Sequence, residues 1–201
     1  MAILSVFATP FPMETFLVAT GIVALAEMGD KTQLLALLLA ARYRRPWPIV
    51  WGIFIATVVN HALAGALGHA VTRVLGPELL RWVLGASFIA MAVWVLMPDR
   101  LDDDGTPAAA PRLGVFGTTV LAFFLAEMGD KTQIATVALA ARHPHWLAVV
   151  GGTTLGMMLA NAPVVWFGDR LLRRLPVRAV HGVSALIFLA LGVLAWLGWD
   201  N

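Results

Sequence analysis

The sequence predicts an all-α polytopic membrane protein with six transmembrane helices, arranged as two inverted three-helix repeats. Composition is the first reason: of 201 residues 60% are hydrophobic and 13% charged, and the mean hydropathy is +0.82. This leaves too little polar surface for a soluble domain. The apolar residues also fall into blocks of about 20, the length that crosses a hydrocarbon core of roughly 30 Å. The third reason is an internal duplication at an offset of 100 residues.

The apolar blocks define the expected spans and their grouping. The six spans are 14–41, 47–69, 79–97, 113–141, 146–168 and 179–199. Basic residues and a proline close the first and fourth spans, at Arg42–Pro46 and at Arg142–Pro144. We therefore expect residues 1–98 to form the first repeat, the polar Pro/Ala-rich stretch 99–112 to be a linker, and residues 113–201 to form the second repeat.

The arginines predict how the spans are oriented. Positive residues accumulate in cytoplasmic loops. The loops after spans one, three and five carry nine arginines: Arg42, Arg44, Arg45, Arg100, Arg112, Arg170, Arg173, Arg174 and Arg178. The opposite side carries three: Arg73, Arg81 and Arg142. This asymmetry predicts a cytoplasmic linker and periplasmic termini. Because every arginine flanks a span, no nucleic-acid partner is expected despite the net charge of +2.

Several chemistries are excluded by what the sequence lacks. There is no cysteine, which excludes disulfides, thiolate metal sites and cysteine nucleophiles. The hydrolase patterns G-x-S-x-G and H-E-x-x-H do not occur. We expect no enzyme activity and no resident cofactor.

The duplication is centred on one motif. Residues 25–33, LAEMGDKTQ, recur identically at 125–133. The same offset relates Gly52 to Gly152 and Phe88 to Phe188, so the whole half is duplicated. Each half holds an odd number of spans, and the second copy must therefore be inverted. Inverted repeats are typical of secondary transporters, which bind their substrate near the midplane where the copies meet.

The motif places charges in the middle of the first and fourth spans. Its charged residues are Glu27, Asp30, Lys31, Glu127, Asp130 and Lys131. Each charge at that depth costs about 2.5–3.5 kcal/mol, so that six would cost roughly 15–20 kcal/mol by addition unless they pair or meet water. Folding does not require such a cost, and a functional site is the default interpretation.

Helical spacing predicts how the charges are used. Glu and Asp at i and i+3 share a helix face, with Lys at i+4 beside them. If both faces meet, four carboxylates oppose two ammonium groups, and the sum of −4 + 2 = −2 equals the charge that one divalent cation neutralises. Carboxylates suit Ca²⁺ and Mn²⁺. The structural alternative is that Glu–Lys and Asp–Lys pairs only lock the helices together.

Other polar residues are candidates for lining the same site. Gly29 and Gly129 allow close helix approach or a local break. Neutral oxygens come from the motif residues Thr32, Gln33, Thr132 and Gln133. Further mid-span groups are Asn60, His61 and Asn161, as auxiliary ligands or as partners in interhelical hydrogen bonds.

The motif E-M-G-D-K-T, present twice, resembles the family of cation/proton exchangers marked by E-x-G-D-(K/R)-(T/S). This family includes Golgi and chloroplast Ca²⁺/Mn²⁺ transporters and bacterial manganese exporters. The resemblance implies exchange of Mn²⁺ or Ca²⁺ against protons, with Glu27, Asp30, Glu127 and Asp130 as ligands of the transported ion. It also implies a location in the bacterial inner membrane.

Two other functions and one assembly question stay open. The chain could export amino acids or other small organic ions on a similar plan, although such a site should carry fewer carboxylates. An intramembrane aspartyl protease fits poorly, because that chemistry needs two aspartates in asymmetric contexts. The pattern Gly152-x-x-x-Gly156 indicates internal helix packing or the face of a homodimer. The expected partners are therefore a divalent cation, protons and the lipid bilayer.

Overall fold

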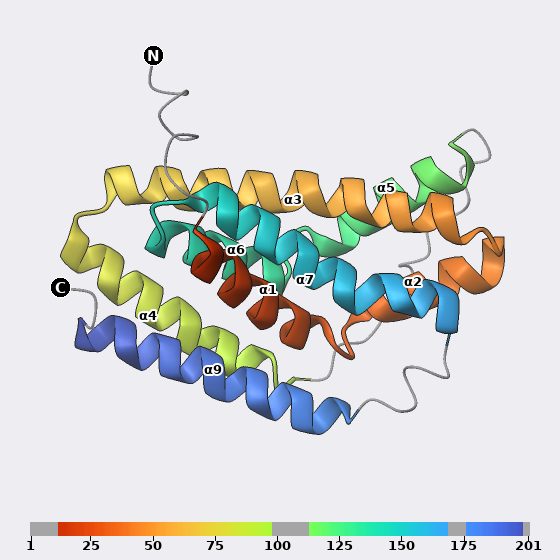
Figure 1. Cartoon of the computed structure of the whole chain (residues 1–201). Coiled ribbons are helices and arrows are strands. Elements are labelled where there is room, and N and C mark those ends of the chain that lie inside the picture. Colours follow the sequence, from red (N-terminus) through yellow and green to blue (C-terminus); the bar gives the residue numbers. More distant parts are fainter. Residues whose placement is uncertain (1–11, 98–112, 169–175, 199–201) are drawn as a thin grey trace, which may run out of the picture.

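The computed structural model describes residues 12–97, 113–168 and 176–198, and within them all regular structure is helical. The helices are α1 (Met13–Glu27), α2 (Lys31–Tyr43), α3 (Pro46–Val74), α4 (Pro77–Trp94), α5 (Gly114–Glu127), α6 (Lys131–Arg142), α7 (Trp146–Phe167) and α9 (Val177–Leu197), as Figure 1 shows. The predicted all-α class is confirmed. The expected linker 99–112 lies outside the described residues, as do the arginines at 100, 112, 170, 173 and 174, so the orientation stays a prediction.

Within the described residues, four helices are long and apolar enough to cross a membrane: α3, α4, α7 and α9. They correspond to the predicted spans 47–69, 79–97, 146–168 and 179–199. Large apolar side chains such as Leu63, Leu67 and Leu186 are exposed on their outer faces. An apolar exterior of this kind is stable in lipid, and the chain is a membrane protein.

The first and fourth predicted spans need correction, because neither is one continuous helix. The range 14–41 is divided into α1 and α2, and 113–141 into α5 and α6, each at Met-Gly-Asp. Gly29 and Gly129 have φ of +87° and +77°, a left-handed conformation that side chains disfavour. The local break that these glycines allow is thus present in both copies.

Helices α3 and α7 form the long scaffold of the molecule (Figure 1). Helix α1 packs on α7, while α5 and α6 pack on α3. Close approach is possible because small residues lie at the contacts. A Cβ on Gly152 would overlap the Phe16 carbonyl of α1, and one on Gly156 would lie 2.6 Å from the Thr20 carbonyl. The G-x-x-x-G pattern therefore serves internal packing, and homodimer formation remains an untested prediction.

Helices α4 and α9 lie side by side as a tight pair (Figure 1). The rings of Phe88 and Phe188 stack with their centroids 6.4 Å apart. The indole of Trp196 covers Gly85 and donates a hydrogen bond to the Trp82 carbonyl at 3.2 Å. The stacked rings, the close contact of Trp196 with Gly85 and the hydrogen bond to Trp82 together hold α4 and α9 as one rigid unit.

Candidate metal centre

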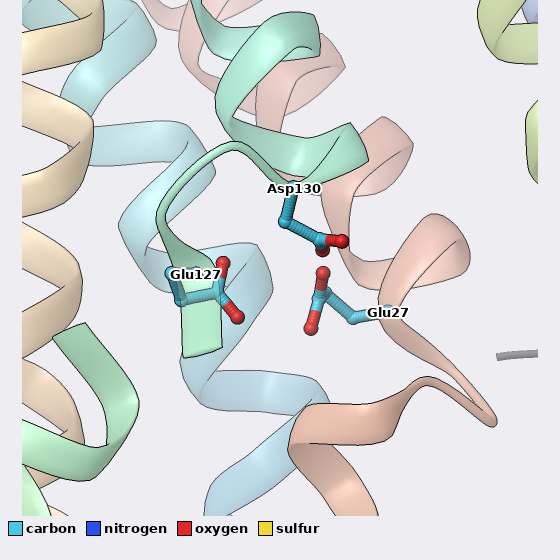
Figure 2. A group of neighbouring side chains, drawn as sticks. All are labelled: Glu27, Glu127 and Asp130. Carbon is cyan, nitrogen blue, oxygen red and sulfur yellow. The ribbon is translucent and has the colours of Figure 1, made fainter. Parts of the chain in front are cut away.

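The two helix breaks bring three carboxylates together in the protein interior. Glu27 is the last residue of α1, Glu127 is the last residue of α5, and Asp130 precedes α6. Figure 2 shows the three carboxylates directed toward one another. Their ligand atoms all lie within 4.8 Å of one another, and all three residues are buried. Such a group can hold a hard cation through its oxygens.

A threonine fixes one oxygen of each glutamate. The Thr32 hydroxyl donates to Oε2 of Glu27 at 2.7 Å, and the Thr132 hydroxyl donates to Oε2 of Glu127 at 3.0 Å. Within the described ranges, Oε1 of both glutamates and Oδ2 of Asp130 are buried without a hydrogen-bond partner. Each glutamate thus has one positioned oxygen and one oxygen available to a cation or a proton.

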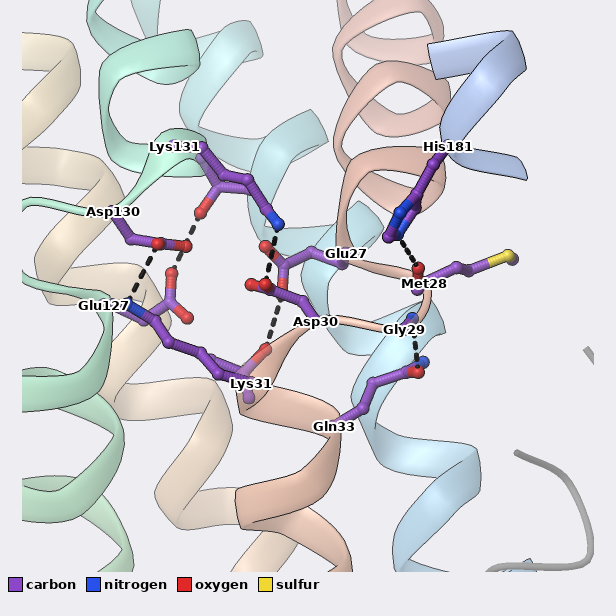
Figure 3. Close-up of polar contacts among 12 residues, drawn as sticks. Glu27, Met28, Gly29, Asp30, Lys31, Gln33, Glu127, Asp130, Lys131 and His181 are labelled. Carbon is purple, nitrogen blue, oxygen red and sulfur yellow. Dashed lines mark hydrogen bonds and ion pairs between the residues drawn. The ribbon is translucent and has the colours of Figure 1, made fainter. Parts of the chain in front are cut away.

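The lysines pair with aspartates of the other repeat (Figure 3). Nζ of Lys31 lies 2.9 Å from Oδ1 of Asp130, and Nζ of Lys131 lies 2.7 Å from Oδ1 of Asp30. The expectation of one shared helix face for Glu, Asp and Lys is wrong, because the break separates Glu from Lys. Three of the four predicted ligands, Glu27, Glu127 and Asp130, come together, and Asp30 is not part of this group.

The motif glutamines brace the breaks. Oε1 of Gln33 accepts a hydrogen bond from the Gly29 N–H, and Oε1 of Gln133 accepts one from the Gly129 N–H, both at 2.8 Å. Nε2 of Gln33 also donates to the Ala160 carbonyl of α7 at 2.8 Å. These amide oxygens support the left-handed glycines rather than adding to the carboxylate group.

The other predicted polar groups lie in α3 and α7 outside the carboxylate group. Nδ2 of Asn60 donates to the Phe124 carbonyl at 3.2 Å, and Nδ2 of Asn161 donates to the Met157 carbonyl at 3.2 Å. The Asn60 bond joins α3 to α5 and is the interhelical hydrogen bond of the alternative interpretation, whereas the Asn161 bond stays within α7. The imidazole of His61 is fully buried, and no described side chain or backbone group hydrogen-bonds to it.

Sequence reasoning missed one polar contact to the site. Nε2 of His181, in α9, lies 2.7 Å from the Met28 carbonyl in the first break (Figure 3). Because a carbonyl only accepts, this ring nitrogen carries the hydrogen. The available signal was the repeat itself: His181 corresponds at the offset of 100 to Arg81, so both copies place a polar residue here in an apolar helix.

Comparison with known proteins identifies the family of this chain. The family described as "Divalent cation/proton antiporter GDT1" matches residues 15–103 and 115–200. The chain belongs to the GDT1 family. A Vibrio cholerae protein named "Putative manganese exporter" is 49% identical over 186 residues, covering 92% of each chain. The Saccharomyces cerevisiae "Divalent cation/proton antiporter GDT1" is 22% identical over 232 residues, covering 88% of this chain and 81% of its own. No solved structure matches.

Membership of the GDT1 family confirms the resemblance carried by the doubled motif. The family consists of antiporters for divalent cations and protons, and the chain is a transporter rather than an enzyme. The aspartyl protease interpretation is thereby excluded. A GDT1-like protein of Synechocystis is also similar, at 28% identity over 192 residues, with 87% of this chain and 93% of that protein covered.

Proposed function

We propose that this GDT1-family antiporter exports Mn²⁺ in exchange for protons and binds the ion at Glu27, Glu127 and Asp130. The observation that carries the proposal is a buried group of three carboxylates supplied by both copies of the motif. The similarity to the Vibrio cholerae protein supports manganese over other divalent ions. Mn²⁺ accepts oxygen ligands readily, whereas Mg²⁺ sheds its water reluctantly. Ca²⁺ is the second candidate.

The charge balance of the site supports a divalent cargo. The pairs Lys31–Asp130 and Lys131–Asp30 each cancel internally. The charges left over are those of Glu27 and Glu127, formally −2, and one divalent cation neutralises them. In a buried site this balance matters, because an uncompensated charge there costs on the order of several kcal/mol. The ion is cargo, and the proposed mechanism requires no resident cofactor.

Proton exchange follows from the same carboxylates. When the cation leaves, two glutamates whose oxygens lie close together in a low-dielectric interior cannot both remain ionised. Proton uptake at this coupled pair restores neutrality and excludes the cation until the protons leave. Protonated and metal-loaded forms are thus mutually exclusive, which is the minimum requirement for antiport.

The proposed architecture is a pair of inverted repeats in the bacterial inner membrane, with periplasmic termini and a cytoplasmic linker. The reciprocal ion pairs support it, since each joins the lysine of one copy to the aspartate of the other. The arginine asymmetry supports the orientation. Reporter fusions test this: a fusion at Asn201 should be active only in a form that matures in the periplasm, and cytoplasmic activity would contradict the proposal.

Transport in proteoliposomes tests the function directly. Purified protein should accumulate Mn²⁺ when a pH gradient is imposed, and collapsing that gradient should abolish accumulation. Parallel assays with Ca²⁺ and Mg²⁺ rank the substrates. Metal-independent protein stability together with amino-acid efflux would favour the alternative, an exporter of small organic ions.

A further inference from the structure

The two motif breaks have the same backbone conformation. Met28 and Met128 have ψ of 116° and 118°, and Asp30 and Asp130 both have ψ of 165°. The glycines between them share the left-handed conformation. Any difference between the two breaks therefore originates in what packs against them.

The breaks differ in how they are covered. At the first break, His181 of α9 donates to the Met28 carbonyl, and a Cβ on Gly29 would overlap Val177 of α9. At the second break, a Cβ on Gly129 would meet nothing within 4 Å, and Met128 is 55% exposed. One break is thus closed over by α9, and the other is open.

The ion pairs reflect the same asymmetry. Lys131 and Asp30 both have side chains that are 0% exposed. In the equivalent pair, the side chain of Lys31 is 26% exposed while that of Asp130 is 2% exposed. One ion pair is therefore sealed, and the lysine of the other is accessible.

The placement of the α4–α9 pair explains both differences. Helix α9 packs on α1, and α4 packs on α6. Among the described residues, α4 makes no comparable contact with α5, and α9 makes none with α2. Figure 1 shows the pair beneath α1 and α6, away from α2 and α5. A rigid pair in this position covers one end of the site and leaves the other end uncovered.

We propose that His181 is the positioning residue that latches the α4–α9 pair over one entrance to the site, and that Arg81 is its counterpart for the other entrance. When the pair moves toward α2 and α5, the Arg81 guanidinium donates a hydrogen bond to the Met128 carbonyl. This bond is the equivalent of the one that His181 donates to the Met28 carbonyl in the present structure. One rigid pair cannot cover both breaks at once, so the entrances open alternately. This inference rests on the proposed transport function, for which it supplies the moving element.

Thiol labelling tests the latch without measuring transport. The chain has no cysteine, so Met28→Cys and Met128→Cys each introduce one thiol at equivalent positions. A membrane-impermeant maleimide, applied to purified protein in detergent, should modify Met128→Cys faster than Met28→Cys. His181→Phe keeps the bulk of the side chain but lacks the N–H donor. Added to Met28→Cys, it should increase the labelling rate about fivefold, because one intramolecular hydrogen bond is lost. His181→Gln retains a donor and should restore slow labelling.

Arg81 provides the complementary experiment. Arg81→Ala should weaken the opposite closed state and so increase labelling of Met128→Cys. Equal labelling of the two single-cysteine proteins, or no change with His181→Phe in a protein that still elutes as a single species, would overturn the latch. Because labelling does not depend on which ion is carried, failure of Mn²⁺ transport with this labelling pattern intact would refute the proposed function alone.

Discussion

Glu27 and Glu127 occupy matching positions. Each is the last residue of a helix, and one oxygen of each accepts a hydrogen bond from a threonine hydroxyl. The sequence predicts these residues as site groups, because uncompensated charge in a membrane span is costly, and the structure places their carboxylates close together. It could not predict that each lysine pairs with the aspartate of the other copy. That pairing depends on how the two breaks meet in space, which helical spacing within one span does not determine.

Neutralising either glutamate tests its role as a ligand. Glu27→Gln or Glu127→Gln should lower Mn²⁺ transport by at least about tenfold, because removing one of two balancing charges costs more than the 1.4 kcal/mol that corresponds to tenfold. Glu14→Gln is the matched control, since Glu14 is exposed at the other end of α1. Uptake into proteoliposomes at equal protein density is the measurement. Equal transport by all three variants would exclude these glutamates as ligands.

The two lysines should differ in their importance for stability. Lys131→Gln removes the ammonium partner of the buried Asp30 carboxylate, and breaking a fully buried ion pair costs about 3–5 kcal/mol. Lys31→Gln should cost less, because Lys31 is partly exposed. Thermal unfolding of the purified variants in detergent measures both. Asp30→Asn combined with Lys131→Gln should recover part of the loss; if Lys31→Gln proved the more damaging change, the buried-pair argument would be wrong.

At the scale of elements, four of the six predicted spans correspond to continuous apolar helices in the described residues, and the division of the other two was considered only as one of two roles for Gly29 and Gly129. Hydropathy does not detect a break when apolar residues continue on both sides, as they do from Ala19 to Leu39. The break requires a left-handed glycine and a brace for its N–H, which Gln33 supplies from the next turn. The brace is recognisable only once the backbone path is known.

Alanine substitution in the breaks separates backbone strain from packing. Gly129→Ala forces a left-handed alanine and should cost about 1–2 kcal/mol. Gly29→Ala carries the same strain and an additional overlap with Val177, which adds about 1–3 kcal/mol of overpacking. Melting temperatures should therefore fall more for Gly29→Ala. A Gly29→Ala/Val177→Ala double variant should return to the level of Gly129→Ala, and failure to do so would show that Val177 does not determine the difference.

At the scale of the whole molecule, a duplicated sequence predicts two equivalent halves, and the structure departs from this at the two breaks. Gly29 and Gly129 have the same surroundings in sequence but different neighbours in space, because the α4–α9 pair lies over one of them. Sequence alone cannot predict this difference, since identical motifs have identical local propensities. The choice between the two placements is made by tertiary packing.

Proton coupling is a property of the whole chain, and it can be measured as the number of protons released when Mn²⁺ binds. Metal binding to these carboxylates requires their deprotonated forms, so Mn²⁺ binding should release protons, and apparent affinity should weaken as pH falls. Calorimetry in buffers of different ionisation enthalpy measures the number released. Binding heats that are independent of the buffer across the acidic to neutral range would point to a uniporter or a channel instead.

The two internal ion pairs have an electrical consequence. Since Lys31–Asp130 and Lys131–Asp30 are neutral, the formal charge of the site is −2 before any ion binds and zero with either one divalent cation or two protons. In the proposed mechanism, a complete exchange cycle then moves two positive charges in each direction and no net charge across the bilayer. Transport should be insensitive to a membrane potential imposed with potassium and valinomycin, even though each unit charge moved through 100 mV is worth about 2.3 kcal/mol. The proton gradient would drive the exporter through its chemical component alone.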